Sequence, residues 1–218
     1  MKLITSIELQ SRPGTHRVNV FLEGSFAFAL AEELAFSLMV GSFLSEAEVA
    51  DLQRRDDLHK VYDSALNLLS YRPRSVSELR SRLLRKSLDP TLVEEALERL
   101  QREKILDDAE FAQFWVDNRR THRPRGGRML QAELRAKGVD REIIKEVLPE
   151  PSEEEAAAYR LALRKATSLS SADWREFRQR VGDHLVRRGF GYEVAGSVAR
   201  RLWEERGQAE PDDAPEET

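Results

Sequence analysis

The sequence predicts a mainly α-helical protein, with three tandem three-helix repeats behind a small N-terminal antiparallel β meander. Three observations predict this fold class. Residues 83–89 recur as residues 134–140 and 185–191, at a constant offset of 51 residues. A fixed period of this size is typical of stacked supersecondary units. Apolar and polar residues alternate only within residues 3–30, and later apolar residues follow helical spacing.

These patterns divide the chain into a β-rich segment, three helical repeats and an acidic tail. We expect their boundaries at residues 1–44, 45–105, 106–150, 151–207 and 208–218. The tail is rich in Pro, Glu and Asp and has no apolar stripe, so we expect it to be disordered. Stacked repeats favour a long binding surface over a single catalytic pocket.

The first segment is expected to form three strands and a short helix. Alternating apolar residues mark the strands: Ile7 and Leu9; Val18, Val20 and Leu22; Phe26, Phe28 and Leu30. Pro13-Gly14 and Glu23-Gly24 supply turn residues between these runs. The short helix is expected around residues 32–39.

Capping residues indicate where the later helices begin. Ser45 with Glu48 and Ser75 with Glu78 match the capping-box pattern. Further N-caps are expected at Asp89 (before Pro90), Asp107-Asp108, Asp140 and Ser171. The helix that begins after Ser45 is expected to break near Asp56-Asp57 and to resume over residues 65–69.

Each repeat is expected to bury one apolar stripe per helix. In the first repeat the stripes are Leu66 and Leu69; Val76, Leu79 and Leu83; Val93, Ala96, Leu97 and Leu100. In the second they are Phe111, Ala112, Phe114 and Trp115; Leu130 and Leu134; Ile143, Ile144, Val147 and Leu148. In the third they are Leu161; Trp174, Phe177, Val181 and Leu185; Val194, Val198, Ala199, Leu202 and Trp203.

Two glycines follow the second helix of their repeats. Gly138 and Gly189 stand where a left-handed residue commonly ends a helix, and Ser87 holds that place in the first repeat. A serine in that conformation should cost a little stability, because its Cβ is disfavoured there.

The residue types argue against an enzyme. The chain has no cysteine, which excludes disulfides and thiolate metal sites and is compatible with a reducing cytoplasm. The four histidines are far apart, and no phosphate-binding glycine loop is present. Asp107-Asp108 could bind a metal, but an N-cap is the favoured interpretation. We expect no catalytic residue, metal or cofactor, and no membrane span, since no run of 18 apolar residues exists.

The net charge of −4 conceals a strong segregation of charge. Residues 61–150 carry +2 and residues 151–203 carry +3, whereas residues 204–218 carry −6. Lys86, Lys137 and Arg188 share one register at the end of the second helix, where a cation also compensates the helix dipole. Arginines that precede or open this helix oppose the dipole, so a partner explains them better.

We therefore expect a basic surface that binds a partner. Its candidate residues are Arg72, Arg74, Arg82, Arg85, Lys86, Arg123, Arg125, Arg128, Arg135, Lys137 and Arg188. Charges that only solvate the surface of an interaction scaffold remain an alternative. A helical-repeat protein that binds DNA phosphates is another, since three-helix units are close to helix-turn-helix geometry.

Residues 61–150 resemble the RecX family of recombination regulators. The matching motifs begin with Ala65-Leu66-x-Leu68-Leu69-Ser70-Tyr71-Arg72-Pro73-Arg74-Ser75 and Glu78-Leu79-x-x-Arg82-Leu83. They continue with Ile105-Leu106-Asp107-Asp108-x-x-Phe111-Ala112, Trp115-Val116, Arg119 and Leu130-x-x-Glu133-Leu134-x-x-Lys137-Gly138-Val139. The strands and the third repeat look like those of longer family members, while Ser87 and the acidic tail depart from the family pattern.

The resemblance implies that the three repeats form an elongated curved array. It also implies a regulatory role rather than a reaction. It implies a cytoplasmic, monomeric protein that binds the groove of the RecA–DNA filament and modulates RecA, mainly by inhibiting its ATPase, filament extension and strand exchange. Single- or double-stranded DNA is a further expected partner. A DNA-binding protein that acts without RecA stays open as the alternative.

Overall fold

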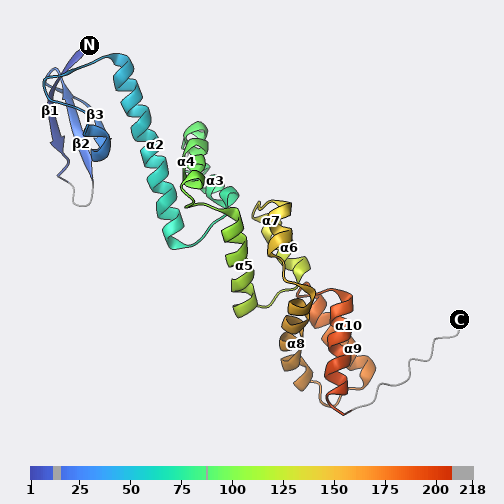
Figure 1. Cartoon of the computed structure of the whole chain (residues 1–218). Helices are drawn as coiled ribbons and strands as arrows, with labels where there is room; N and C mark the ends of the chain where they lie inside the picture. Colours follow the sequence, from blue (N-terminus) through green and yellow to red (C-terminus); the bar gives the residue numbers. More distant parts are fainter. Residues whose placement is uncertain (12–15, 87, 208–218) are drawn as a thin grey trace. The chain divides into compact units, whose positions relative to one another are not determined.

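The computed structural model describes residues 1–11, 16–86 and 88–207, in which a β-sheet is followed by a series of helices (Figure 1). The chain divides into two compact units. Met1–Arg72 with Leu79–Leu106 is called the N-terminal unit, and Pro73–Glu78 with Asp107–Thr218 the C-terminal unit. The turn expected at Pro13-Gly14, the departure at Ser87 and the disorder expected over residues 208–218 lie outside the described residues.

The mainly helical fold class with an N-terminal antiparallel sheet is confirmed. Strands β1 (Lys2–Leu9), β2 (Arg17–Leu22) and β3 (Ser25–Ala31) form the expected meander. A further strand, β4 (Phe43–Leu44), pairs with β1, so the order in the described part of the sheet is β3-β2-β1-β4. Strand β4 was not predicted, because two residues cannot show an alternating pattern.

A β-bulge in the meander overturns one expected core position. Val20 lies opposite Phe28, but the next residue, Phe21, lies opposite Phe26. This shift by one extra residue moves Phe26 to the other face of the sheet, where it is 59% exposed. Phe28 and Leu30 are buried as expected, whereas Leu9, at the end of β1, is also exposed.

Helix α1 (Glu32–Ala35) is shorter than the expected helix over residues 32–39. The chain turns after it, with the Leu38 N–H bonded to the Ala35 carbonyl at 2.9 Å. Gly41 then takes a left-handed φ of 92° and donates its N–H to the Ile4 carbonyl. The hydrogen bond from Gly41 to β1 therefore forms in place of a further helical turn.

Helix α2 (Glu46–Tyr71) is continuous, so the break expected near Asp56-Asp57 is wrong. It begins at Ser45 with the expected capping box to Glu48. Asp56 is only 2% exposed, because its carboxylate accepts hydrogen bonds from Arg17 at 2.8 and 3.1 Å and from the Ala31 N–H at 2.8 Å. Asp56, which was expected to break the helix, instead links α2 to β2 and β3 through hydrogen bonds.

Three groups of helices carry the repeats. The first contains the C-terminal part of α2, α3 (Val76–Leu84) and α4 (Pro90–Arg102). The second contains α5 (Asp108–His122), α6 (Gly127–Ala136) and α7 (Arg141–Val147). The third contains α8 (Pro151–Thr167), α9 (Trp174–Val186) and α10 (Tyr192–Glu204).

Most expected caps and stripes of these helices are confirmed. Asp89, Asp107 and Asp140 cap α4, α5 and α7 through their side chains. Asp173, and not Ser171, caps α9 by accepting a hydrogen bond from the Glu176 N–H at 2.8 Å. Phe114, expected in the core, is 45% exposed. The expected stripes with the deepest burial are those of α4, α6 and α9.

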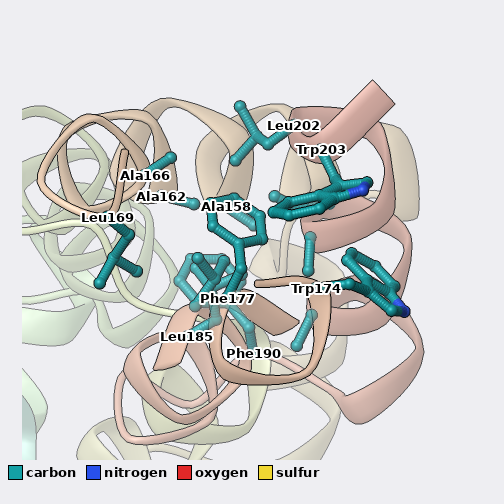
Figure 2. Packing of buried hydrophobic residues seen from close by; sticks show 14 of the residues in the cluster. Ala158, Ala162, Ala166, Leu169, Trp174, Phe177, Leu185, Phe190, Leu202 and Trp203 are labelled. Carbon is teal, nitrogen blue, oxygen red and sulfur yellow. The ribbon is translucent and has the colours of Figure 1, made fainter. Parts of the chain in front are cut away.

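The third repeat has an aromatic core (Figure 2). The rings of Trp174 and Phe177 face Trp203 of α10, with centroid distances of 5.5 and 5.2 Å. Small residues on α8, such as Ala158 and Ala162, let the other two helices approach closely. Pairs of tilted rings at this distance add to the stability gained from burial alone.

Candidate partner-binding surface

The expected binding residues differ widely in exposure. Six are exposed: Arg82, Arg85, Lys86, Arg123, Arg128 and Arg135. Four are half-buried: Arg72, Arg125, Lys137 and Arg188. Arg74 is only 7% exposed. Solvent access therefore favours the exposed six as contacts for a partner.

The second repeat docks onto the start of α3 through backbone groups. The Ser75 hydroxyl donates to the Lys137 carbonyl at 2.6 Å, and the Val76 N–H donates to the Asp108 carboxylate at 2.9 Å. Gly138 has a φ of 75°, and a Cβ there would lie 2.4 Å from that of Ser77. Glycine is needed at this position for its conformation and for the close approach.

The third repeat docks onto the start of α6 in the same way. The Gly126 N–H donates to the Arg188 carbonyl at 2.9 Å, and the Gly127 N–H donates to the Glu154 carboxylate at 2.9 Å. Gly189 has a φ of 90°, and a Cβ there would lie 2.4 Å from that of Met129.

The 51-residue period explains why the two junctions match. Adding 51 converts Ser75 to Gly126, Lys137 to Arg188 and Gly138 to Gly189. At each junction the residue that follows an Arg-Pro-Arg segment thus bonds to the carbonyl of the basic residue after the next repeat's second helix. Hydrogen bonds to the backbone therefore join these distant positions inside the C-terminal unit.

Side chains of the first of these junctions form a compact ionic cluster. We call it the Glu133 cluster, and its members are Glu78, Trp115, Arg119, Glu133 and Lys137. Glu133 accepts hydrogen bonds from the Trp115 ring N–H and the Arg119 guanidinium, each at 2.8 Å. Lys137 donates to Glu78 at 2.6 Å. The side chains of the four charged members are 19–24% exposed.

The indole of Trp115 contacts two cations. The Arg119 guanidinium carbon lies 4.3 Å from the ring centroid, and the Lys137 ammonium lies 4.5 Å from it. Cations over an aromatic face gain electrostatic energy, most of all where water is partly excluded. The cluster therefore balances its charges internally and ties α3, α5 and α6 together.

This geometry gives some candidate residues a structural role. Lys137 neutralises Glu78, and the Arg125 Nε lies 3.8 Å from the second carboxylate oxygen of Glu133. Their contacts with a partner stay a prediction. Trp115 was expected in the core, and the ion pairs with Glu78 and Glu133 were not predicted. The available signal was the spacing of four residues within Trp115–Arg119 and Glu133–Lys137.

Asp107 acts as a helix cap. Its carboxylate accepts hydrogen bonds from the Ala109 N–H at 2.7 Å and the Glu110 N–H at 3.2 Å. Among the described residues, no three His, Asp or Glu side chains gather in a way that could hold a metal ion. In the same part of the chain, no helix combines the length and the apolar character needed to cross a bilayer.

Comparison with known proteins identifies the family. Models of the RecX N-terminal domain and of its first, second and third three-helix domains match residues 2–42, 62–100, 107–148 and 153–198. Regulatory protein RecX of Bacillus licheniformis is 36% identical over 205 residues, which cover 91% of this chain and 76% of the relative. The chain belongs to the RecX family.

Further RecX proteins agree with this assignment. Regulatory protein RecX of Bacillus subtilis is 33% identical over 208 residues, covering 93% of this chain and 78% of the relative. A crystal structure of a regulatory protein RecX matches with a TM-score of 0.78 at 28% identity, covering 92% of this chain and all of the other. RecX from Lactobacillus salivarius, at 23% identity and a TM-score of 0.64, matches in fold over 68% of this chain and 97% of its own.

The three three-helix domains of RecX thus correspond to the three groups of helices described above. Several of the motif residues that suggested the family lie at the first junction, where Ser75, Glu78, Trp115, Glu133 and Lys137 bond or pack. In this chain, these RecX motif residues hold neighbouring repeats together.

Proposed function

We propose that this chain regulates RecA by binding the RecA–DNA filament, and that it mainly inhibits RecA's ATPase, filament extension and strand exchange. The observation that carries the proposal is the match of four RecX domain models, which begins at residue 2 and ends at residue 198. The relatives that match this chain bear the name regulatory protein RecX. We further propose that the protein acts as a cytoplasmic monomer without catalysis or a cofactor of its own.

Exposed arginines on the segment that leads into α6 and in its first turn are the proposed filament contacts. Arg123 is the C-cap residue of α5, four residues before α6, and Arg128 lies in the first turn of α6; both are exposed. The positive charge of Arg128 opposes the dipole of α6 and costs stability. Binding to an acidic protein surface or to DNA phosphates would compensate for this cost.

The test is charge reversal at these two arginines. Arg123→Glu with Arg128→Glu should abolish inhibition of RecA's DNA-dependent ATPase and leave the circular dichroism spectrum unchanged. Arg125 is left intact, because a carboxylate there would repel Glu133. The matched control is Arg141→Glu with Arg175→Glu, which makes the same change in net charge at exposed first-turn positions of α7 and α9. Full inhibition by the folded double variant would refute the proposed contacts.

A DNA-binding protein that acts without RecA is the second candidate. The observation that favours it is the positive charge of residues 61–150 and 151–203, which is carried by three-helix units. Gel shifts on bare DNA over a salt series distinguish the two candidates. Tight binding with a steep salt dependence, combined with no effect on the RecA ATPase, would select the second.

A further inference from the structure

The third repeat contains a counterpart of the Glu133 cluster without its carboxylates. At the 51-residue offset, Glu133 corresponds to His184, Lys137 to Arg188 and Glu78 to Met129. The first helices of the two repeats are offset by 46 residues, since their domain matches begin at residues 107 and 153. At that offset, Asp108 corresponds to Glu154 and Arg119 to Lys165.

The contacts support this correspondence. Asp108 and Glu154 both accept the N–H of the first residue of the preceding repeat's second helix, at 2.9 Å in each case. The cations are kept in the third repeat, as Lys165 and Arg188, whereas both carboxylates are replaced. Dipole compensation explains cations near helix ends, but it does not explain the loss of the two acidic partners.

The described residues of the third repeat at these positions carry positive charge without acidic partners. Lys165, His184 and Arg188 are half-buried, and the adjacent Arg187 is exposed. In the described part of the chain, no ion pair joins Lys165, Arg187 or Arg188 to a carboxylate. At the offsets above, Lys165 and His184 take the places of Arg119 and Glu133, which are hydrogen-bonded at 2.8 Å in the second repeat, and Arg188 follows His184 by four residues. Burial lowers the pKa of His184, and the positive charges of Arg188, Lys165 and Arg187 lower it further.

The docking of the third repeat extends this positive region. Because Gly126 donates to the Arg188 carbonyl, the end of α9 lies against the segment that precedes α6. That segment contains the exposed Arg123, three residues before Gly126. Two segments that carry cations are therefore in contact, and one of them follows His184, the position that holds a carboxylate in the second repeat.

We propose that Lys165, His184, Arg187 and Arg188 bind a backbone phosphate of nucleic acid. An external anion would take the place of the missing Glu133 and Glu78 carboxylates. Arginine forks and a lysine ammonium suit phosphate oxygens, and they are common contacts to nucleic-acid backbones. The exposed Arg123 lies on the segment that is bonded to the end of α9, and a second cation there favours a polymer of regularly spaced anions over a single carboxylate.

This inference deepens the proposed function, on which it rests, by assigning DNA phosphates to one end of the C-terminal unit. Its test uses the full chain without RecA. Anisotropy of fluorescein-labelled oligothymidylate, and in a second arm of a labelled duplex, is measured over a salt series. Arg187→Glu with Arg188→Glu should weaken binding at least about tenfold and lower the slope of log affinity against log salt by about 2. The matched control, Arg141→Glu with Arg175→Glu, should bind like the unmodified chain.

A second readout follows His184 directly. Burial and the charges of Arg188, Lys165 and Arg187 lower the pKa of its imidazole. A bound phosphate offsets these charges, so the pKa of His184 measured by NMR should rise when the oligonucleotide is added. A histidine with only a structural role would show no such change.

Each other outcome overturns the inference. Equal DNA binding by the two double variants would remove the site, and so would an unchanged His184 pKa at saturating oligonucleotide. Equal competition by polyglutamate would replace phosphate by carboxylate as the ligand. If the unmodified chain binds neither oligonucleotide, the inference fails, while the proposed function still depends on the separate RecA ATPase assay.

Discussion

Gly126→Ala should separate the third repeat from the second. A Cβ at residue 126 would lie 2.3 Å from the carbonyl carbon and oxygen of Gly189 and from the Phe190 nitrogen. These are backbone atoms, so no side chain can rotate away to make room. The added methyl group must push the end of α9 away from α6.

The magnitude follows from two losses. Forcing an extra carbon into a closely packed contact costs about 1–3 kcal/mol. Moving the backbones apart also stretches the hydrogen bond from the Gly126 N–H to the Arg188 carbonyl, now 2.9 Å, and such a bond contributes about 0.5–1.5 kcal/mol. We therefore expect the free energy of unfolding to fall by about 2–4 kcal/mol.

Urea unfolding followed by tryptophan fluorescence isolates the relevant region. The three tryptophans, Trp115, Trp174 and Trp203, all lie in the C-terminal unit. Gly182→Ala is the matched control, because a Cβ there meets nothing within 4 Å and alanine should stabilise the interior of α9 by up to about 1 kcal/mol. A Gly126→Ala variant as stable as the unmodified chain would refute the docking geometry.

Three further perturbations probe the core, the ionic cluster and the sheet. Leu134→Ala, at a fully buried position of α6, should cost about 2–5 kcal/mol in the same assay; a loss under about 1 kcal/mol would contradict the burial. Glu133→Gln should cost about 1–3 kcal/mol, because the Arg119 guanidinium loses its anionic partner, and an unshifted Trp115 emission would count against the cluster. Burial raises the pKa of Asp56, but hydrogen bonds from Arg17, Lys60 and the backbone outweigh it and the net pKa is lowered. The stability from Asp56 is therefore present above its unfolded pKa of about 3.9 and lost as pH falls through the folded pKa; Asp56→Asn should remove this part of the acid sensitivity in urea unfolding followed by circular dichroism.

Local signals in the sequence predicted most of the helices. Ser45 with Glu48, and the aspartates at residues 89, 107 and 140, mark helix starts through bonds to N–H groups within three residues. Such bonds depend only on neighbouring residues. The left-handed Gly138 and Gly189 were predictable for the same reason, since their conformation ends a helix locally.

The wrong predictions concern features that depend on distant residues. Asp56 does not break α2, because Arg17 on β2 pairs with its carboxylate. The exposure of Phe26 follows from a register shift against β2, which no pattern within β3 records. Strand β4 exists only because β1 offers it an edge. In each case a tertiary partner outweighed the local preference.

The candidate binding residues show the same division. Their charge and their register could be predicted from the sequence, but their ionic partners could not. Glu78 lies 59 residues from Lys137, and Arg119 lies 14 residues from Glu133. The docking of one repeat on the next brings Lys137 within hydrogen-bond distance of Glu78, and the packing of α5 against α6 does the same for Arg119 and Glu133. The docking also depends on glycines, whose close contacts no charge pattern records.

Three cations in one register need not share one role. Lys86 is exposed beyond the end of α3, Lys137 is neutralised by Glu78, and Arg188 has His184 where Lys137 has Glu133. A repeat preserves the position of a side chain relative to its own helix, whereas the neighbours that decide its charge balance come from two repeats. Substitution of those neighbours can convert a closed ionic cluster into an open anion site while the backbone contacts stay the same. Differences between repeats in the residues around a shared cation are therefore better indicators of binding than the shared cation itself.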